Sequence, residues 1–198
     1  MSMETGRCRW CNGKNPRYVE YHDHEWGQPE HDDHRLYEML LLESFQAGLS
    51  WECILNKREA FRKAFDNFDV EAVAAYDEER QALLAQDPGI VRNKLEIRAA
   101  VGNARIFRSI QAEYGSFDKY IWGFTHGATL YECGLATSPW SDAISQDLQR
   151  RGMKFVGSTI IYSLLQAIGI INSHEEGCFL HVDRAQAHKT DKQEQGSK

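Results

Sequence analysis

The chain turns at Leu84-Ala85-Gln86-Asp87-Pro88-Gly89-Ile90-Val91, a short segment between two stretches with helical periodicity. Pro88 restricts its own φ angle, and Gly89 permits a tight or left-handed conformation. The order helix, glycine turn, helix is the outline of a helix-hairpin-helix, which can present backbone N–H groups and a helix start to a DNA phosphate. Pro-Gly turns also join helices in many other proteins, so this segment alone predicts a turn and leaves DNA binding open.

Helical patterns extend from the turn in both directions and cover residues 33–171. Asp33 and Asp69 precede helical runs, as capping residues do, and Gly48, Gly115 and Gly152 end them. No strand alternation or internal repeat is visible, so we predict an all-α fold. We expect residues 1–184 to form a single helical domain, which could consist of two packed lobes. Residues 185–198 are polar, and we expect a disordered tail there.

The bulk composition indicates a folded protein of the cytoplasm. The 198 residues are 42% hydrophobic, which is enough to form a core. Residues 1–7 contain no apolar run, and polar residues interrupt the apolar stretch 155–171, so we expect a buried helix there and no membrane contact. The five cysteines are an odd number, which argues against a disulfide framework and leaves metal binding or burial. We expect a monomer.

The helix predicted after Asp33 carries a carboxylate on its apolar side. Leu36, Leu40, Glu43 and Ala47 follow each other at steps of four, three and four, so Glu43 lies in the middle of the apolar stripe. An unpaired carboxylate is unfavourable in a protein interior. Glu43 is therefore either a partner in a structural ion pair or part of a site that binds a cation or hydrogen-bond donors.

Aromatic residues are concentrated in the N-terminal third of the chain. They can form a second hydrophobic core, or they can supply flat faces on which an unpaired base stacks, with cation–π attraction if the base is positively charged. Trp51 follows the break Gly48-Leu49-Ser50 at a helix start, where its ring could line the pocket that Glu43 faces. The group comprises Trp10, Tyr18, Tyr21, Trp26, Phe45 and Trp51.

Potential metal ligands lie at opposite ends of the chain. His174 and Cys178 form a His-x-x-x-Cys pair near the C-terminus, and Cys8 and His22 lie near the N-terminus. Two cysteines and two histidines make a closed tetrahedral zinc site, which is typical of structural zinc. Cys11 completes a CxxC pair with Cys8 and is an alternative ligand or a redox partner.

A metal-dependent phosphohydrolase is a rival interpretation. The segments His22-Asp23 and His31-Asp32-Asp33-His34 contain the residue types that hold catalytic ions in such enzymes. Asp33 is also well placed as a helix cap, and polar residues are common at a helix start. We therefore give this interpretation less weight.

The formal net charge of −6 requires any DNA-binding face to be local, because DNA affinity depends on Lys and Arg that neutralise phosphates. Near the turn, the backbone of Gly89 and the side chains of Arg92 and Lys94 are the candidates for phosphate contacts, in binding that is weak, salt-sensitive and independent of sequence. Each basic cluster is more often a solvated helix face. The clusters are Lys57-Arg58, Arg62-Lys63, Arg92-Asn93-Lys94-Leu95-Glu96-Ile97-Arg98 and Arg150-Arg151-Gly152-Met153-Lys154.

Five stretches in this order resemble the type I 3-methyladenine-DNA glycosylase family, a branch of the helix-hairpin-helix DNA repair superfamily. Together they extend over nearly the whole folded part. The stretches are Arg7-Cys8-Arg9-Trp10, Tyr21-His22-Asp23-His24-Glu25-Trp26-Gly27, Leu42-Glu43-Ser44-Phe45-Gln46-Ala47-Gly48-Leu49-Ser50-Trp51, Arg151-Gly152-Met153-Lys154-Phe155-Val156-Gly157 with the following Tyr162 and Gln166-Ala167, and His174-Glu175-Glu176-Gly177-Cys178.

The resemblance implies roles for individual residues. It implies that Glu43 contacts a flipped base, that Trp51 and Tyr21 stack around this base, and that Tyr18 and Trp10 form pocket wall. It further implies one structural zinc ion that ties the termini together. The ligands implied for this zinc are Cys8, His22, His174 and Cys178, with Cys11 as the departure from the family pattern.

The resemblance also implies a reaction. A helix-hairpin-helix glycosylase of this type flips N3-methyladenine out of double-stranded alkylated DNA, hydrolyses the glycosidic bond and releases free 3-methyladenine, the first step of base excision repair. Many superfamily members carry an aspartate after the hairpin, whereas residues 98–108 contain no carboxylate here. A non-catalytic, zinc-stapled DNA-binding module is the alternative that the sequence leaves open.

Overall fold

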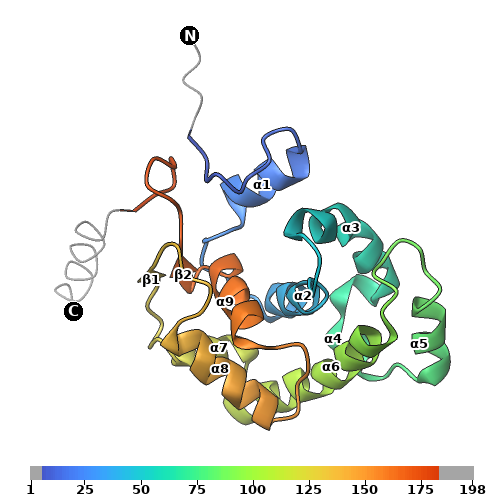
Figure 1. Cartoon of the computed structure of the whole chain (residues 1–198). Helices are drawn as coiled ribbons and strands as arrows, with labels where there is room; N and C mark the ends of the chain where they lie inside the picture. The colour runs from blue at the N-terminus through green and yellow to red at the C-terminus, as the bar shows by residue number, and fades with distance from the viewer. Residues whose placement is uncertain (1–5, 183–198) are drawn as a thin grey trace.

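The computed structural model describes residues 6–182, in which helices surround the buried helix α2 (Figure 1). The expected disordered tail, residues 185–198, lies outside the described residues. No helix of the described part is long and apolar enough to cross a membrane. The helices are α1 (Pro16–His24), α2 (Asp33–Ser44), α3 (Trp51–Ala64), the short 3₁₀ helix η1 (Asp66–Phe68), α4 (Val70–Ala74), α5 (Glu78–Leu84), α6 (Lys94–Tyr114), α7 (Phe117–Gly123), α8 (Pro139–Arg150) and α9 (Ser158–Ala167).

The architecture confirms the helical fold class and adds one short pair of strands. Strand β1 (Leu130–Tyr131) pairs in parallel with β2 (Ile171–Asn172), with Leu130 opposite Ile171. Two-residue strands leave no alternation in the sequence, which explains why the sequence did not predict them. The pair connects the segment after α7 to the segment after α9 (Figure 1).

Helix α2 forms the centre of the fold and is buried from residue 36 to residue 44. It packs against α6, α7 and α9. Leu36, Leu40 and Glu43 are all buried, as their spacing predicts. Ala47 is exposed because the helix ends at Ser44 and a turn carries the chain outward.

The N-cap of α2 differs from the prediction by one residue. Asp32, and not Asp33, occupies the cap, where its side chain accepts a hydrogen bond from the backbone N–H of Arg35 at 3.0 Å. The carboxylate of Asp33 instead accepts hydrogen bonds from the backbone N–H groups of Phe117 and Asp118, both at 2.8 Å. It therefore satisfies free donors at the start of α7, a contact across 84 positions that local sequence does not reveal.

The predicted hairpin is present between α5 and α6, and Asn93 caps the second helix. Gly89 does not adopt a left-handed conformation. A Cβ at this position would lie 2.9 Å from the Cβ of Ala60 and 3.0 Å from Oδ1 of Asp87, so close packing against α3 explains the glycine. Lys57 of α3 donates to the carbonyl of Gly89 at 3.2 Å and joins the hairpin to α3.

Helix α3 is fastened to the rest of the fold by buried ion pairs. The side chain of Glu38 is 2% exposed and accepts from Nε of Arg58 at 2.7 Å and from Nη2 of Arg62 at 2.8 Å. Arg58 also donates to the carboxylate of Glu25 at 2.8 Å. Because each buried charge has a partner, removal of one member leaves another without compensation.

We predict that Glu38→Gln lowers the free energy of unfolding by about 3 kcal/mol, the low end for a broken buried pair, since Glu25 still compensates Arg58. Chemical denaturation measures the change. The matched control is Glu71→Gln, which breaks the exposed Glu71–Arg108 pair and should change stability by less than about 1 kcal/mol. Equal effects of the two substitutions would contradict the role given to the buried pair.

Candidate active site and metal centre

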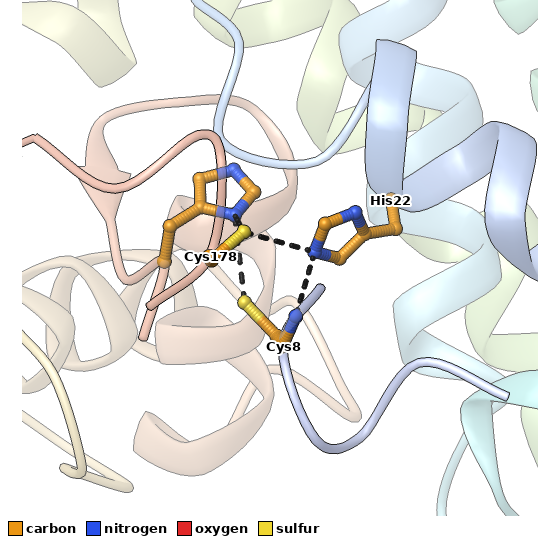
Figure 2. Close-up of side chains that lie close together, drawn as sticks. Cys8, His22 and Cys178 are labelled. Carbon is orange, nitrogen blue, oxygen red and sulfur yellow. Dashed lines mark hydrogen bonds between the residues drawn. The ribbon is translucent and has the colours of Figure 1, made fainter. Parts of the chain in front are cut away.

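Four side chains from the two ends of the described chain meet in a buried cluster. Their ligand atoms all lie within 4.8 Å of one another, and each of the four residues is buried. Figure 2 shows Cys8, His22 and Cys178 converging on one point from three segments. The cluster consists of Cys8, His22, His174 and Cys178.

The distances within this cluster fit a tetrahedral metal ion. Sγ of Cys178 lies 3.5 Å from Nε2 of His22 and 3.4 Å from Nδ1 of His174, and Sγ of Cys8 lies 3.5 Å from the same Nδ1. Zinc–sulfur and zinc–nitrogen bonds in a tetrahedron separate the ligand atoms by about 3.3–3.8 Å. The geometry therefore suits zinc, and it brings together the four residues named from the sequence.

Protonation equilibria in the cluster also favour a cation. Burial raises the pKa of the Cys8 thiol to about 12, so a thiolate there requires a nearby positive charge. Burial lowers the pKa of His174 to about 4, which keeps its imidazole neutral and able to ligate. A metal ion would supply the charge that the buried sulfur atoms lack.

The second nitrogen of each histidine has a partner outside the cluster. Nδ1 of His22 lies 2.8 Å from Oδ1 of Asp23, and Arg7 donates to both carboxylate oxygens of Asp23. The hydrogen bond from Arg7 lowers the pKa of Asp23 to about 2. Nε2 of His174 lies 3.2 Å from the carbonyl oxygen of Trp26. Such contacts hold the imidazole rings in the orientation that metal ligation requires.

Cys11 stands outside the cluster, although it shares a CxxC pair with Cys8. Its sulfur lies 3.7 Å from the carbonyl oxygen of Tyr18. The structure thus places Cys8, the ligand that the resemblance implies, in the cluster and leaves the alternative Cys11 outside it.

The histidines of the phosphohydrolase interpretation do not converge. Nδ1 of His31 lies 2.6 Å from Oδ1 of Asp118, and Nε2 of His34 lies 2.6 Å from the backbone oxygen of Asn67. Within residues 6–182, the Cys8 cluster is the only group of three or more Cys, His, Asp or Glu side chains placed to share a metal ion. The arrangement therefore does not support catalysis by a metal held at His31 and His34.

A cavity of about 330 Å³ lies beside the cluster and is lined by five aromatic residues and by several polar side chains. All five residues predicted for the base pocket line it. These are Trp10, Tyr18, Tyr21, Glu43 and Trp51. The size is that of a small-ligand site, and flat rings together with polar side chains suit a heteroaromatic ligand.

The aromatic rings of the cavity contact one another edge to face or at a tilt. The ring centroids of Tyr21 and Trp51 are 5.4 Å apart, and those of Trp10 and Tyr18 are 5.2 Å apart. Each ring thus has a neighbour that limits its rotation. The aromatic walls of the cavity are thus held by contacts among themselves.

Glu43 is the electrostatic centre of the cavity. Its side chain is buried, its Oε2 atom has no hydrogen-bond partner, and burial raises the pKa of its carboxyl group to about 8. No Lys or Arg among the described residues forms an ion pair with it, which argues against the structural ion-pair interpretation. The indole N–H of Trp51 is also buried without a partner. Two residues that line the cavity thus carry buried polar atoms without a partner in the protein.

Several residues of the cavity were not predicted from the sequence. Trp26 belongs to the aromatic group that the sequence singled out, and Gln46 follows Glu43 by three positions. Ser163, Gln166 and Ser173 come from α9 and the segment after it, and tertiary packing alone brings them to the cavity.

The basic clusters divide into paired and unpaired groups. Arg58, Arg62, Arg150 and Arg151 are all engaged by carboxylates. By contrast, Arg92 and Lys94 are exposed at the hairpin and form no ion pair within residues 6–182. The N–H of Gly89 already donates to Oδ1 of Asp87 at 2.7 Å. The side chains of Arg92 and Lys94 are therefore more accessible to a phosphate than the Gly89 backbone.

Comparison with known proteins places this geometry in context. Residues 10–181 match the family described as methyladenine glycosylase. DNA-3-methyladenine glycosylase 1 of Escherichia coli strain K12 is 45% identical over 179 residues, which cover 87% of this chain and 95% of that protein. DNA-3-methyladenine glycosylase of Haemophilus influenzae is 34% identical over 180 residues, 88% of this chain and 97% of that protein.

Solved structures agree with the sequence comparison. A crystal structure of 3-methyladenine DNA glycosylase I superposes with a TM-score of 0.86 at 42% identity and covers 89% of this chain and all of that chain. A variant of 3-methyladenine DNA glycosylase I solved in complex with 3-methyladenine superposes with a TM-score of 0.81 at 35% identity, over 84% of this chain and 92% of that chain. With the match extending over most of the sequence and the fold, this chain belongs to the methyladenine glycosylase family.

Proposed function

We propose that this chain is a DNA-3-methyladenine glycosylase that removes 3-methyladenine from alkylated DNA in base excision repair. The observation that carries the proposal is the unpaired, buried carboxyl group of Glu43 in a cavity with aromatic walls. Relatives named for this activity span nearly the whole chain. One of the similar structures holds 3-methyladenine itself.

The residues of the cavity have distinct roles in this proposal. Methylation at N3 makes the adenine of the nucleotide cationic. This charge favours the ionised form of Glu43, so only the damaged base gains attraction from its carboxylate. Trp51 and Tyr21 stack around the flipped base, with Tyr18 and Trp10 as further pocket wall. Cation–π attraction adds up to about 2 kcal/mol for a desolvated cation. Ordinary adenine can stack in the pocket but lacks this charge.

Catalysis follows from the leaving group. The positive charge weakens the glycosidic bond, so the base leaves as a neutral molecule and needs no strong acid to protonate it. Water attacks the sugar carbon as the bond to the base breaks, and the water releases a proton. Flipping costs a few kcal/mol, which stacking and the contact with Glu43 offset. Glu43 stabilises the positive charge shared between base and sugar as the bond lengthens.

The proposed cofactor is one zinc ion held by Cys8, His22, His174 and Cys178. A closed site of four protein ligands supplies a structural cross-link and leaves no position for substrate. Ligands separated by 166 positions make the cross-link an effective constraint on the unfolded chain. Zinc therefore stabilises the fold in this proposal.

Duplex DNA is the proposed macromolecular partner, bound through phosphates near the hairpin. The exposed and unpaired side chains of Arg92 and Lys94 support this placement. Contacts to phosphates carry no sequence information, which suits an enzyme that must inspect any sequence.

We predict that Glu43→Gln lowers kcat/KM for methylated DNA and the affinity for free 3-methyladenine. Expressed as free energies, each loss should be about 1–3 kcal/mol, the range for a charge-assisted hydrogen bond. Base-release assays and a base titration measure the two losses. The wild-type protein failing to release 3-methyladenine would instead favour a non-catalytic DNA-binding module.

The same substitution separates a binding role for Glu43 from a structural one. The folded-state pKa of Glu43 is raised to about 8, so the unfolded chain loses this proton first and the stability contributed by Glu43 falls as pH rises toward 8. Glu43→Gln removes this slope and should be more stable than the wild type at pH 8, with a smaller difference at pH 5. Denaturation curves of both proteins at both pH values test this. A large loss of stability in Glu43→Gln would indicate a structural ion pair.

We predict one zinc per chain by elemental analysis and a clear loss of zinc and of melting temperature in His174→Ala, because the variant removes one of four ligands. Cys11→Ser is the matched control, since Cys11 lies outside the cluster and the variant should keep both zinc and melting temperature. Zinc loss in the control with retention in His174→Ala would refute the ligand set.

We predict that Lys94→Glu weakens binding to any duplex equally and lowers the dependence of the affinity on salt, with a slope reduced by about one or two ions. Lys119→Glu is the control, because Lys119 is also exposed and lies on α7, which follows the opposite end of α6. Titrations at several salt concentrations compare the variants. An unaltered slope in Lys94→Glu would remove the hairpin from the DNA face.

A further inference from the structure

Two tryptophans of the cavity wall pack directly on the histidines of the metal cluster. The ring of Trp26 lies edge to face on His174, with centroids 4.7 Å apart, and stacks on His22 at 6.3 Å. Trp10 contacts His22 at 5.2 Å and Trp26 at 4.7 Å. One wall of the cavity and the metal cluster are thus a single packed unit.

A hydrogen bond links the same two parts through the backbone. Nδ1 of His174 faces both sulfur atoms, and Nε2 lies 3.2 Å from the carbonyl oxygen of Trp26. An imidazole that ligates through Nδ1 carries its proton on Nε2. Metal binding therefore selects the tautomer in which His174 donates to Trp26.

The backbone at Gly27, directly after Trp26, leaves room for the imidazole ring of His174. Gly27 has a φ of +76°, and a Cβ there would lie 3.1 Å from Nε2 of His174. Glycine thus lets the turn approach the imidazole closely. On another side of the cavity, Trp51 contacts Tyr21, and within residues 6–182 it has no ring contact with either cluster histidine.

We propose that His174 is a positioning residue for the base pocket: the bound metal orients its imidazole, which in turn holds Trp26 in the wall that the base contacts. The inference rests on the proposed function of the cavity as a base pocket. It adds to the metal site a role beyond joining the chain ends, since metal coordination and base binding are then coupled through Trp26.

A variant that keeps the metal but loses the imidazole tests the coupling. Nδ1 of histidine is close to Cβ, so His174→Cys places a sulfur at a similar reach and leaves a site of three cysteines and one histidine, a common zinc set. We expect this variant to bind one zinc and to melt cooperatively. Its affinity for free 3-methyladenine should fall at least about fivefold, the low end of typical coupling between sites. Zinc-loaded His174→Cys with wild-type affinity would overturn the proposal.

A spectroscopic measurement tests the coupling between metal site and base pocket even if His174→Cys takes up no metal. Cobalt(II) replaces zinc in such sites, and its visible spectrum reports the ligand geometry. Saturation of the cobalt-loaded wild-type protein with free 3-methyladenine should shift this spectrum, because the base presses on Trp26 and thereby on His174. Cobalt-loaded Glu43→Gln at the same base concentration should shift in proportion to its lower occupancy. An unchanged wild-type spectrum at saturation refutes the coupling.

Failure of the underlying function has a different signature. If the zinc-loaded wild-type protein does not bind free 3-methyladenine in a direct titration, the base pocket itself is wrong. If the wild type binds the base and either coupling test is negative, only the positioning role of His174 is wrong.

Discussion

The meeting of Cys8, His22, His174 and Cys178 is the contact on which the rest of the site depends. It joins segments 166 positions apart, and closing so long a loop in an unfolded chain costs conformational entropy. Because Trp10 and Trp26 pack on the histidines of this cluster, the same contact fixes one wall of the cavity. Stability at the chain ends and shape in the cavity therefore have a common origin. The four ligand atoms are spaced for a tetrahedral ion, which would hold them in place without taking part in the chemistry of the base.

Glu43 is a buried acid that the fold leaves without a partner. Helix α2 is buried on all sides around it, and a carboxylate without a partner is unfavourable in such a place. The nearby ion pairs of Glu38 with Arg58 and Arg62 show that this region can supply partners to a buried acid. Glu43 has no such partner, and burial without a nearby positive charge raises its carboxyl pKa to about 8. In the proposed function, the positive charge of the damaged nucleotide base supplies this partner, and ordinary adenine lacks that charge.

The charge distribution reconciles a net charge of −6 with a DNA partner. Most of the arginines in the basic clusters, such as Arg58 and Arg151, are engaged by carboxylates within the fold and contribute little field at the surface. Arg92 and Lys94 at the hairpin are exposed and unpaired within the described residues. A small local excess of positive charge, and not the total, is what phosphate binding requires.

Sequence alone determined the helical class and the burial of Glu43, because helical periodicity is a local property. The candidate pocket and metal-binding residues came from their chemistry and from the family resemblance. The sequence left Cys11 as an alternative to Cys8, and it assigned the cap of α2 to Asp33, which in fact accepts hydrogen bonds at the start of α7. It explained Gly89 by backbone freedom, whereas the packing of Ala60 against it is the reason. Only the tertiary structure decided these points and the contact between His174 and Trp26. Each depends on atoms that lie close in space although their residues are separated along the chain. A pattern of neighbouring residues does not specify which of several chemically suitable side chains makes such a contact.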